Sequence, residues 1–151
     1  MRVSGGVLKP HIFERARIAT LNTHHGMAPM IRVMWSIPWG IVEGRASWIG
    51  VTIHEIDAGI DTGRVLWNGT PQLAPGDTDI DLFFRSHVEA AEALANLIKI
   101  YAAGGTPPDW TTASSGESAY RSAPGLGARF RLRRNGRGLR AHILVERGLR
   151  C

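Results

Sequence analysis

The residue types most suited to chemistry lie between positions 21 and 63 of the 151-residue chain. Two short motifs bound this stretch, Asn22-x-His24 at its start and Asp57-x-Gly59-x-Asp61-Thr-Gly at its end. An amide donates to a developing oxyanion, an imidazole transfers protons near neutral pH, and a carboxylate orients an imidazole. Brought together, the two motifs would make a site for proton transfer and oxyanion stabilisation, and glycine would let a ligand approach the backbone closely.

Each motif taken alone also has a purely structural interpretation. An Asn before a His is often a loop cap, and an Asp before Thr-Gly often forms a turn. A metal site is a further alternative, because His24, His25 and His54 accompany the two aspartates. Neighbouring histidines on a strand point to opposite faces, however, and the chain has no HExxH or CxxC spacing. We therefore expect no bound metal.

The first motif follows a predicted strand-helix-strand unit. Residues 3–8 and 18–21 are short apolar runs, and Pro10 favours the first turn of a short helix between them, over the letters HIFERA. Such a unit favours parallel pairing of its two strands. Asn22 and His24 come directly after the second strand. A period of two places both side chains on one face, at the strand end that binds ligands in open α/β sheets.

The second motif lies between two predicted strands. Apolar and polar residues alternate over 49–54, which predicts a half-buried strand, and RVLW at 64–67 is the next strand. We expect the two to pair as an antiparallel hairpin across the turn. Upstream of them, apolar residues at helical spacing over 30–42 predict a helix that Pro38 interrupts.

A long amphipathic helix is predicted to begin after Thr78. Thr78 and Asp81 match a capping box, and Gly104-Gly105 is expected to end the helix. Its role is structural, and its predicted core-facing stripe consists of Ile80, Phe83, Phe84, Ala91, Leu94, Leu97, Ile98 and Tyr101.

The net charge of +5 is unevenly distributed along the chain. Residues 1–120 hold nine Lys or Arg and twelve Asp or Glu, whereas residues 121–151 hold nine Arg and one Glu. We divide the chain into a catalytic part at 1–110 and a Ser/Gly/Arg-rich tail at 111–151, which we expect to be poorly ordered. Nucleic-acid binding through the clustered arginines is the alternative for this tail.

The cellular compartment is predicted from what the chain contains. The sequence shows no signal peptide and no apolar stretch long enough to span a bilayer. Its single cysteine, Cys151, excludes an internal disulfide and suits a reducing compartment. We therefore expect a cytoplasmic protein with no membrane partner.

Taken together, the motifs resemble the catalytic domain of the folate-dependent formyltransferases. The residues that carry the resemblance are Asn22-x-His24, Pro29, Arg32, Gly50-Val-Thr-Ile and Asp57-x-Gly59-x-Asp61-Thr-Gly. The family includes methionyl-tRNA, glycinamide ribonucleotide and sugar N-formyltransferases, and the similarity spans residues 3–104. It implies an α/β, Rossmann-like formyltransferase fold that lacks its first strands, with a central mixed sheet flanked by helices.

The resemblance implies transfer of a formyl group from 10-formyltetrahydrofolate to an amine. Asn22, His24 and Asp61 match the family's catalytic trio. In that arrangement Asn22 donates to the oxyanion and His24 shuttles a proton. Asp61 orients the imidazole and favours its cationic form.

The folate ring of family members lies between a strand-to-helix turn and the DxGxD loop. On this chain the resemblance assigns Gly6 and Leu8 to the first position and Ile56, Asp57 and Gly59 to the second. One residue departs from the family pattern, because Val33 follows Arg32 where the family has Arg-Gly. If that backbone requires a positive φ, a β-branched residue strains it.

The acceptor and the partners follow from what the chain lacks relative to the family. The tRNA-type C-terminal domain is absent, so an amino sugar or another small amine is preferred over methionyl-tRNA. The family's strands before residue 3 are also absent. We expect the exposed strand edge at 3–8 to drive self-association or to be covered by another chain. The alternatives are a formyl-folate hydrolase that uses the same trio, and a truncated, non-catalytic remnant or interaction module.

Overall fold

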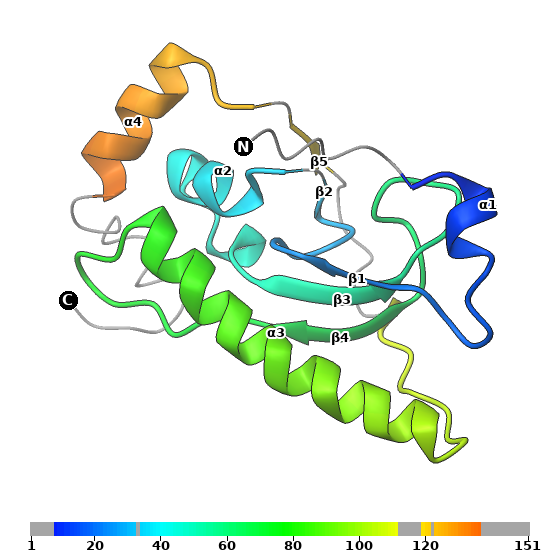
Figure 1. The fold of residues 1–151 in the computed structure, drawn as a ribbon. Coiled ribbons are helices and arrows are strands. Elements are labelled where there is room, and N and C mark those ends of the chain that lie inside the picture. The colour runs from blue at the N-terminus through cyan, green and yellow to red at the C-terminus, as the bar shows by residue number, and fades with distance from the viewer. Residues whose placement is uncertain (1–7, 33, 112–118, 122, 137–151) are drawn as a thin grey trace.

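The computed structural model describes residues 8–32, 34–111, 119–121 and 123–136. Its elements in chain order are α1 (Pro10–Phe13), β1 (Leu21–His24), β2 (Ile31–Arg32), α2 (Ser36–Glu43), the 3₁₀ turn η1 (Ala46–Trp48), β3 (Val51–Glu55), β4 (Val65–Gly69), α3 (Asp79–Ala102), β5 (Ala119–Tyr120) and α4 (Leu126–Gly136). A three-stranded sheet has the order β1-β3-β4, and β2 and β5 form a separate pair. The long helix α3 packs along the sheet, and α2 and α4 lie together at one end of it (Figure 1).

The strand that carries Asn22 and His24 begins where the predicted strand was expected to end. β1 covers Leu21–His24, so both side chains belong to the strand itself. It pairs antiparallel with β3, in a register that sets Asn22 opposite His54. The predicted parallel pairing of this strand with the one at 3–8 stays a prediction, and in the described residues only β2 and β5 pair in parallel. Most of the strand predicted at 3–8 lies outside the described residues.

The hairpin of β3 and β4 is confirmed. The strands pair antiparallel, with Val51 opposite Gly69 and Ile53 opposite Trp67. The prediction that β3 is half-buried is wrong, because Thr52 and His54 are as fully buried as their apolar neighbours. Ile53 packs in a cluster with residues of α3, while the other face of β3 is covered by the loops that build the site.

The helix predicted over 30–42 is shorter than expected. Its first residues form β2, and α2 begins only at Ser36. Pro38 falls in the first turn of α2, where a missing N–H breaks no hydrogen bond, so it does not interrupt the helix. Ile37 and Ile41 of α2 pack in a buried cluster with Leu82 of α3.

The capping box of α3 is confirmed, because the Thr78 side chain accepts from the Asp81 amide and the Asp81 carboxylate accepts from the Thr78 amide. The helix ends before Gly104, which has a φ of 72°. Its predicted apolar stripe is partly wrong. The buried residues are Leu82, Ser86, Ala90 and Leu97, whereas Ile80, Phe83, Phe84 and Ile98 are exposed. α3 has two apolar faces, and periodicity alone does not tell which one meets the sheet.

The Arg-rich segment contains the helix α4 over residues 126–136, and the expected poor order of the tail as a whole stays a prediction. Leu132 of α4 packs against the α2 cluster, and the Asn135 side-chain amide donates to the Ile41 carbonyl at 3.5 Å. These contacts provide the burial that the arginine-rich composition did not indicate. The division at residue 110 and the nucleic-acid alternative stay predictions, and residues 137–151 lie outside the described part. No helix in the described ranges combines the length and apolarity needed to cross a bilayer.

Candidate active site

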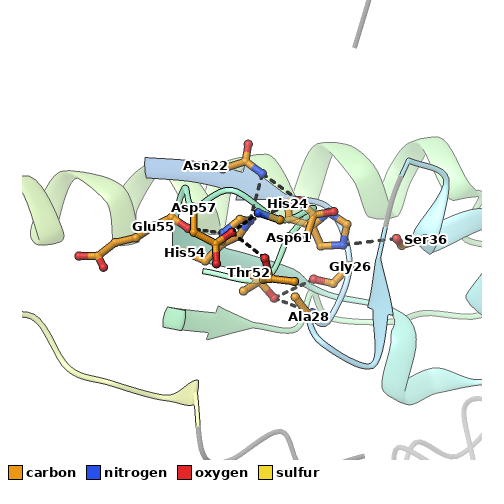
Figure 2. Close-up of polar contacts among 12 residues, drawn as sticks. Asn22, His24, Gly26, Ala28, Ser36, Thr52, His54, Glu55, Asp57 and Asp61 are labelled. Carbon is orange, nitrogen blue, oxygen red and sulfur yellow. Dashed lines mark hydrogen bonds and ion pairs between the residues drawn. The ribbon is translucent and has the colours of Figure 1, made fainter. Parts of the chain in front are cut away.

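The three residues singled out as a trio meet in space (Figure 2). The Nδ1 atom of His24 lies 3.4 Å from Oδ2 of Asp61, and the side-chain amide of Asn22 donates to Oδ1 of Asp61 at 3.3 Å. Asn22 and His24 share one face of β1, as their spacing predicted, and Asp61 reaches them from the turn between β3 and β4. The two motifs are therefore one site, although 37 and 39 residues separate the partners along the chain.

The turn that carries Asp61 is held by Asp57. The Asp57 carboxylate accepts from the Gly59 amide at 2.9 Å and from the Thr62 hydroxyl at 2.6 Å, an arrangement typical of an Asx turn. Asp61 itself has a φ of 50°, in the left-handed region that Asp tolerates better than most residues. A Cβ at Gly63 would overlap the carbonyl oxygen of Glu55, so glycine is needed to bring the turn this close to β3.

His24 has a definite tautomer in this geometry. Its Nε2 atom lies 3.0 Å from the carbonyl oxygen of Ile31, which only accepts, so we assign the ring hydrogen to Nε2. Nδ1 is then the basic nitrogen, and it faces Asp61. Burial lowers the pKa of His24 below its usual 6.5, although Asp61 and the Ile31 carbonyl both act to raise it. The effect of Asp61 has the expected direction, but burial outweighs it and His24 is neutral at pH 7.

His54 is a fourth member of the site that the sequence interpretation considered only as a metal ligand. Its Nδ1 donates to the Glu55 carbonyl at 2.7 Å, so Nε2 accepts from the side-chain amide of Asn22 at 3.1 Å. Nε2 also lies 3.4 Å from Oδ1 of Asp61. This role follows from the pairing register of β1 and β3, which sets His54 directly opposite Asn22.

Both amide hydrogens of Asn22 are therefore engaged within the site. One bond goes to His54 and the other to Asp61. A role for Asn22 as oxyanion donor requires that one of these bonds be exchanged for a bond to the substrate. Exchanging the bond to His54 costs little, because a hydrogen bond to an anionic oxygen is stronger than one between neutral groups, whereas the bond to the Asp61 carboxylate is already to an anionic oxygen.

The loop after His24 is held against the site by Thr52. The Thr52 hydroxyl donates to the Gly26 carbonyl at 2.8 Å and accepts from the Ala28 amide at 3.1 Å. A Cβ at Gly26 would lie 2.5 Å from Cβ of Ser36 and 2.8 Å from Nε2 of His24. Glycine at this position thus allows the loop, the imidazole and the start of α2 to pack together.

A cleft of about 790 Å³ opens beside the trio. Its lining includes Leu8, Ile56, Asp57 and Gly59, the residues expected at the folate ring, and Gly6 and Val33 lie outside the described residues. The volume falls in the range of small-molecule sites. Within the described residues, no group of three or more His, Cys, Asp or Glu side chains is placed to hold a metal ion.

Known proteins resemble this chain in sequence and in fold. A family model described as "Formyl transferase" matches residues 5–98, which is more than half of the chain. The chain belongs to the formyl transferase family. The resemblance that the motifs indicated is thereby confirmed at the level of the family.

Two relatives of this formyl transferase chain are methionyl-tRNA formyltransferases. The protein of Agathobacter rectalis is 29% identical over 118 residues, covering 78% of this chain and 37% of that protein. The protein of Anaeromyxobacter dehalogenans is 32% identical over 104 residues, covering 69% of this chain and 33% of that protein. The chain thus spans about a third of the length of these relatives.

Solved formyltransferases share the fold. The formyltransferase PseJ from Anoxybacillus kamchatkensis superposes with a TM-score of 0.61 at 24% identity, over 77% of this chain and 59% of that one. An N-formyltransferase from Helicobacter canadensis superposes with a TM-score of 0.61 at 22% identity, over 78% and 42%. This confirms the expected α/β, Rossmann-like formyltransferase fold, although the three-stranded sheet described here is antiparallel.

Proposed function

We propose that this chain transfers a formyl group from 10-formyltetrahydrofolate to a small amine. The observation that carries the proposal is the meeting of Asn22, His24 and Asp61 at the cleft that Leu8 and Ile56 also line. The PseJ structure was solved with a UDP-linked formamido sugar and tetrahydrofolate, and the Helicobacter canadensis structure with folinic acid and dTDP-3-aminofucose. These complexes favour an amino sugar or another small amine over methionyl-tRNA.

The donor fits the character of the cleft. Leu8 and Ile56 offer apolar surface for a flat ring, and Gly59 allows close approach to the backbone of the turn. The Asp57 carboxylate is engaged by the Gly59 amide and the Thr62 hydroxyl, so its role here is to shape the turn. We assign Leu8, Ile56, Asp57 and Gly59, with Gly6, to donor binding.

The reaction requires one bond to form and one to break. The amine nitrogen attacks the formyl carbon, whose carbonyl oxygen becomes an oxyanion, and the bond from that carbon to N10 of the folate then breaks. The products are a formamide and tetrahydrofolate, and the proton lost by the amine balances the proton gained by N10. Transfer therefore needs an oxyanion donor and a group that takes up a proton and returns it.

The described residues supply both functions. His24 is neutral with its lone pair on Nδ1, so the His24–Asp61 pair can accept the amine proton and pass it to N10. The Asp61 carboxylate stabilises the imidazolium that forms in between. Asn22 donates to the oxyanion after exchanging one of its bonds, and His54 positions the amide that does so.

We also propose that the chain associates with a second copy of itself. Within the described residues β1 is an outer strand of the three-stranded sheet, and α3 exposes apolar side chains that include Phe84, Val88 and Ile98. Unpaired strand edges and apolar surfaces favour association. Size-exclusion chromatography with light scattering tests this proposal, and a monomer across the accessible concentration range contradicts it.

A formyl-transfer assay with His24→Ala tests the proposed chemistry. We expect transfer from 10-formyltetrahydrofolate to an amine, with kcat falling by about 10²–10⁴ in the variant, the usual contribution of a positioned acid–base group. Binding of 5-formyltetrahydrofolate should persist. His11→Ala, on the exposed helix α1, is the matched control. Equal rates in His24→Ala and wild type contradict the mechanism, and formate release without an amine favours the hydrolase alternative.

A further inference from the structure

The cleft has two ends, set by the direction of β1. At the start of the strand the Ile56 amide donates to the Thr20 carbonyl at 2.8 Å, which places Ile56 beside the beginning of β1. At the other end His25 directly follows the strand, and its ring lies 4.5 Å from the ring of Phe83 on α3. The trio lies between these ends. With the donor at the Ile56 end, the end near Phe83 is left for the acceptor.

The acceptor end has an apolar wall of large, accessible side chains. Met34 and Trp35 come from the segment before α2, and Ile80 and Phe83 come from the first turns of α3. All four line the cleft, and all four remain exposed. Exposed large apolar groups that converge at the mouth of a cleft are typical of a binding surface rather than of a core.

Trp35 is held in a backbone conformation that a bulky residue rarely adopts. Its φ is 76°, in the left-handed region, and 46% of its surface is exposed. The position immediately precedes α2, and its side chain makes no capping hydrogen bond. Local propensity favours Gly or Asn here, and unfavourable backbone conformations of this kind cluster at ligand-binding sites.

The charges around the cleft discriminate between amines. In the described part of the chain, no Lys or Arg lines the cleft, while the carboxylates of Asp57, Asp61 and Asp79 do. Burial lowers the pKa of His24 and lowers that of His25 to about 4, so neither imidazole adds a positive charge at pH 7. Proteins recognise phosphates chiefly with Arg and Lys. This cleft therefore attracts an ammonium group and repels a phosphate.

We propose that the acceptor held in this cleft is a phosphate-free amine with an apolar, aromatic group that packs against Trp35. The inference rests on the proposed formyl transfer and narrows its acceptor class away from nucleotide-linked sugars. Met34, Ile80 and Phe83 complete the apolar surround. Asp79, at the first position of α3, supplies negative charge for the ammonium group before it loses its proton.

Three amines that differ in one property each test the proposal. Phenethylamine carries an aromatic ring, ethanolamine carries neither a ring nor a phosphate, and phosphoethanolamine carries a phosphate. With 10-formyltetrahydrofolate as donor, we expect kcat/KM to fall in that order. In Trp35→Gly we expect the ratio of kcat/KM for phenethylamine to that for ethanolamine to fall about three- to tenfold, the usual effect of losing one aromatic contact. Trp35→Gly keeps the fold, because glycine adopts a φ of 76° without strain.

Trp110 provides a matched control, because it is 47% exposed but does not line the cleft. Trp110→Ala should leave the ratio between the two amines unchanged. Trp35→Tyr, which keeps an aromatic ring, should restore most of the preference for phenethylamine. A ratio that is the same in Trp35→Gly and wild type overturns the proposal, as does faster transfer to phosphoethanolamine than to phenethylamine.

A binding measurement separates this proposal from the proposed reaction. Calorimetric titration of phenethylamine into the chain saturated with 5-formyltetrahydrofolate requires no turnover. We expect binding that weakens about three- to tenfold in Trp35→Gly and no detectable binding of phosphoethanolamine. If phenethylamine binds in this way but no amine is formylated, the reaction is wrong and the subsite stands. If transfer occurs but phenethylamine binding does not depend on Trp35, the reaction stands and the subsite is wrong.

Discussion

Nε2 of His24 donates to the carbonyl of Ile31 at 3.0 Å, and this bond decides which nitrogen of the imidazole is basic. Ile31 belongs to β2, so a strand remote from the turn that carries Asp61 sets the tautomer of His24. Nδ1 is left facing the Asp61 carboxylate at 3.4 Å. The proton-transfer geometry therefore depends on three separate segments of the chain.

The lowered pKa of His24 predicts the acid side of the pH–rate profile. kcat/KM should fall on acidification only below pH 6.5, because burial keeps the imidazole neutral to lower pH. Asp61→Asn removes the carboxylate that raises this pKa, so the fall in kcat/KM on acidification should occur at still lower pH. The rate should also fall by about 10²–10⁴. If the fall moved to higher pH in Asp61→Asn, Asp61 would not raise the pKa of His24.

Acid should destabilise the fold through His25. Its pKa is lowered to about 4 by burial and by the neighbouring His87, so the unfolded chain takes up the proton first as the pH falls from 6.5. The free energy of unfolding should decrease between pH 6.5 and pH 4 by about 1–2 kcal/mol from this group, after allowance for its partial exposure. His25→Phe should remove that share, as measured by urea denaturation at pH 7 and pH 4.5. An identical pH dependence in His25→Phe and wild type would exclude His25 as the cause.

His54 should act by positioning Asn22. His54→Ala leaves the Asn22 amide without one acceptor, and we expect kcat to fall about tenfold or more with little change in the KM of the donor. His54→Gln offers an amide oxygen to Asn22 and should recover part of the loss, whereas a residue needed only for packing would not show this recovery. Steady-state kinetics with varied 10-formyltetrahydrofolate measures both constants.

Gly63 should be intolerant of any side chain. A Cβ at this position overlaps the Glu55 carbonyl, so Gly63→Ala must displace the turn that presents Asp61, at a cost of about 1–3 kcal/mol in the free energy of unfolding. Gly125 is the matched control, because nothing lies within 4 Å of a Cβ built there. Chemical denaturation of Gly63→Ala and Gly125→Ala compares them directly, and equal stabilities would contradict the close approach.

Two adjacent residues test which face of α3 meets the sheet. Leu97 is 4% exposed and packs with Ile53 and Leu66, whereas Ile98 is 55% exposed. Leu97→Ala should lower the free energy of unfolding by about 2–5 kcal/mol. Ile98→Ala should change it by no more than about 0.5 kcal/mol in the monomer. A larger loss from Ile98→Ala at low protein concentration would mean that the helix is rotated relative to the structure.

Much of the local structure was predictable from neighbouring residues. The capping box at Thr78 and the end of α3 at Gly104 depend on contacts a few residues apart, and the hairpin of β3 and β4 joins consecutive strands across one turn; all three are confirmed. What the sequence did not determine depends on partners that lie far along the chain. The pairing of β1 with β3, the buried face of α3 and the packing of α4 on α2 each depend on such partners.

The site divides in the same way. The residue types and spacing of the two motifs determined that an amide, an imidazole and a carboxylate were available, because chemical identity and strand periodicity are properties of the sequence. Only the tertiary structure decided that His54 joins them, that both hydrogens of the Asn22 amide are already engaged, and that burial rather than Asp61 dominates the pKa of His24. These three properties depend on distances between separate segments and on the exclusion of solvent from the site. Both arise only when the chain folds.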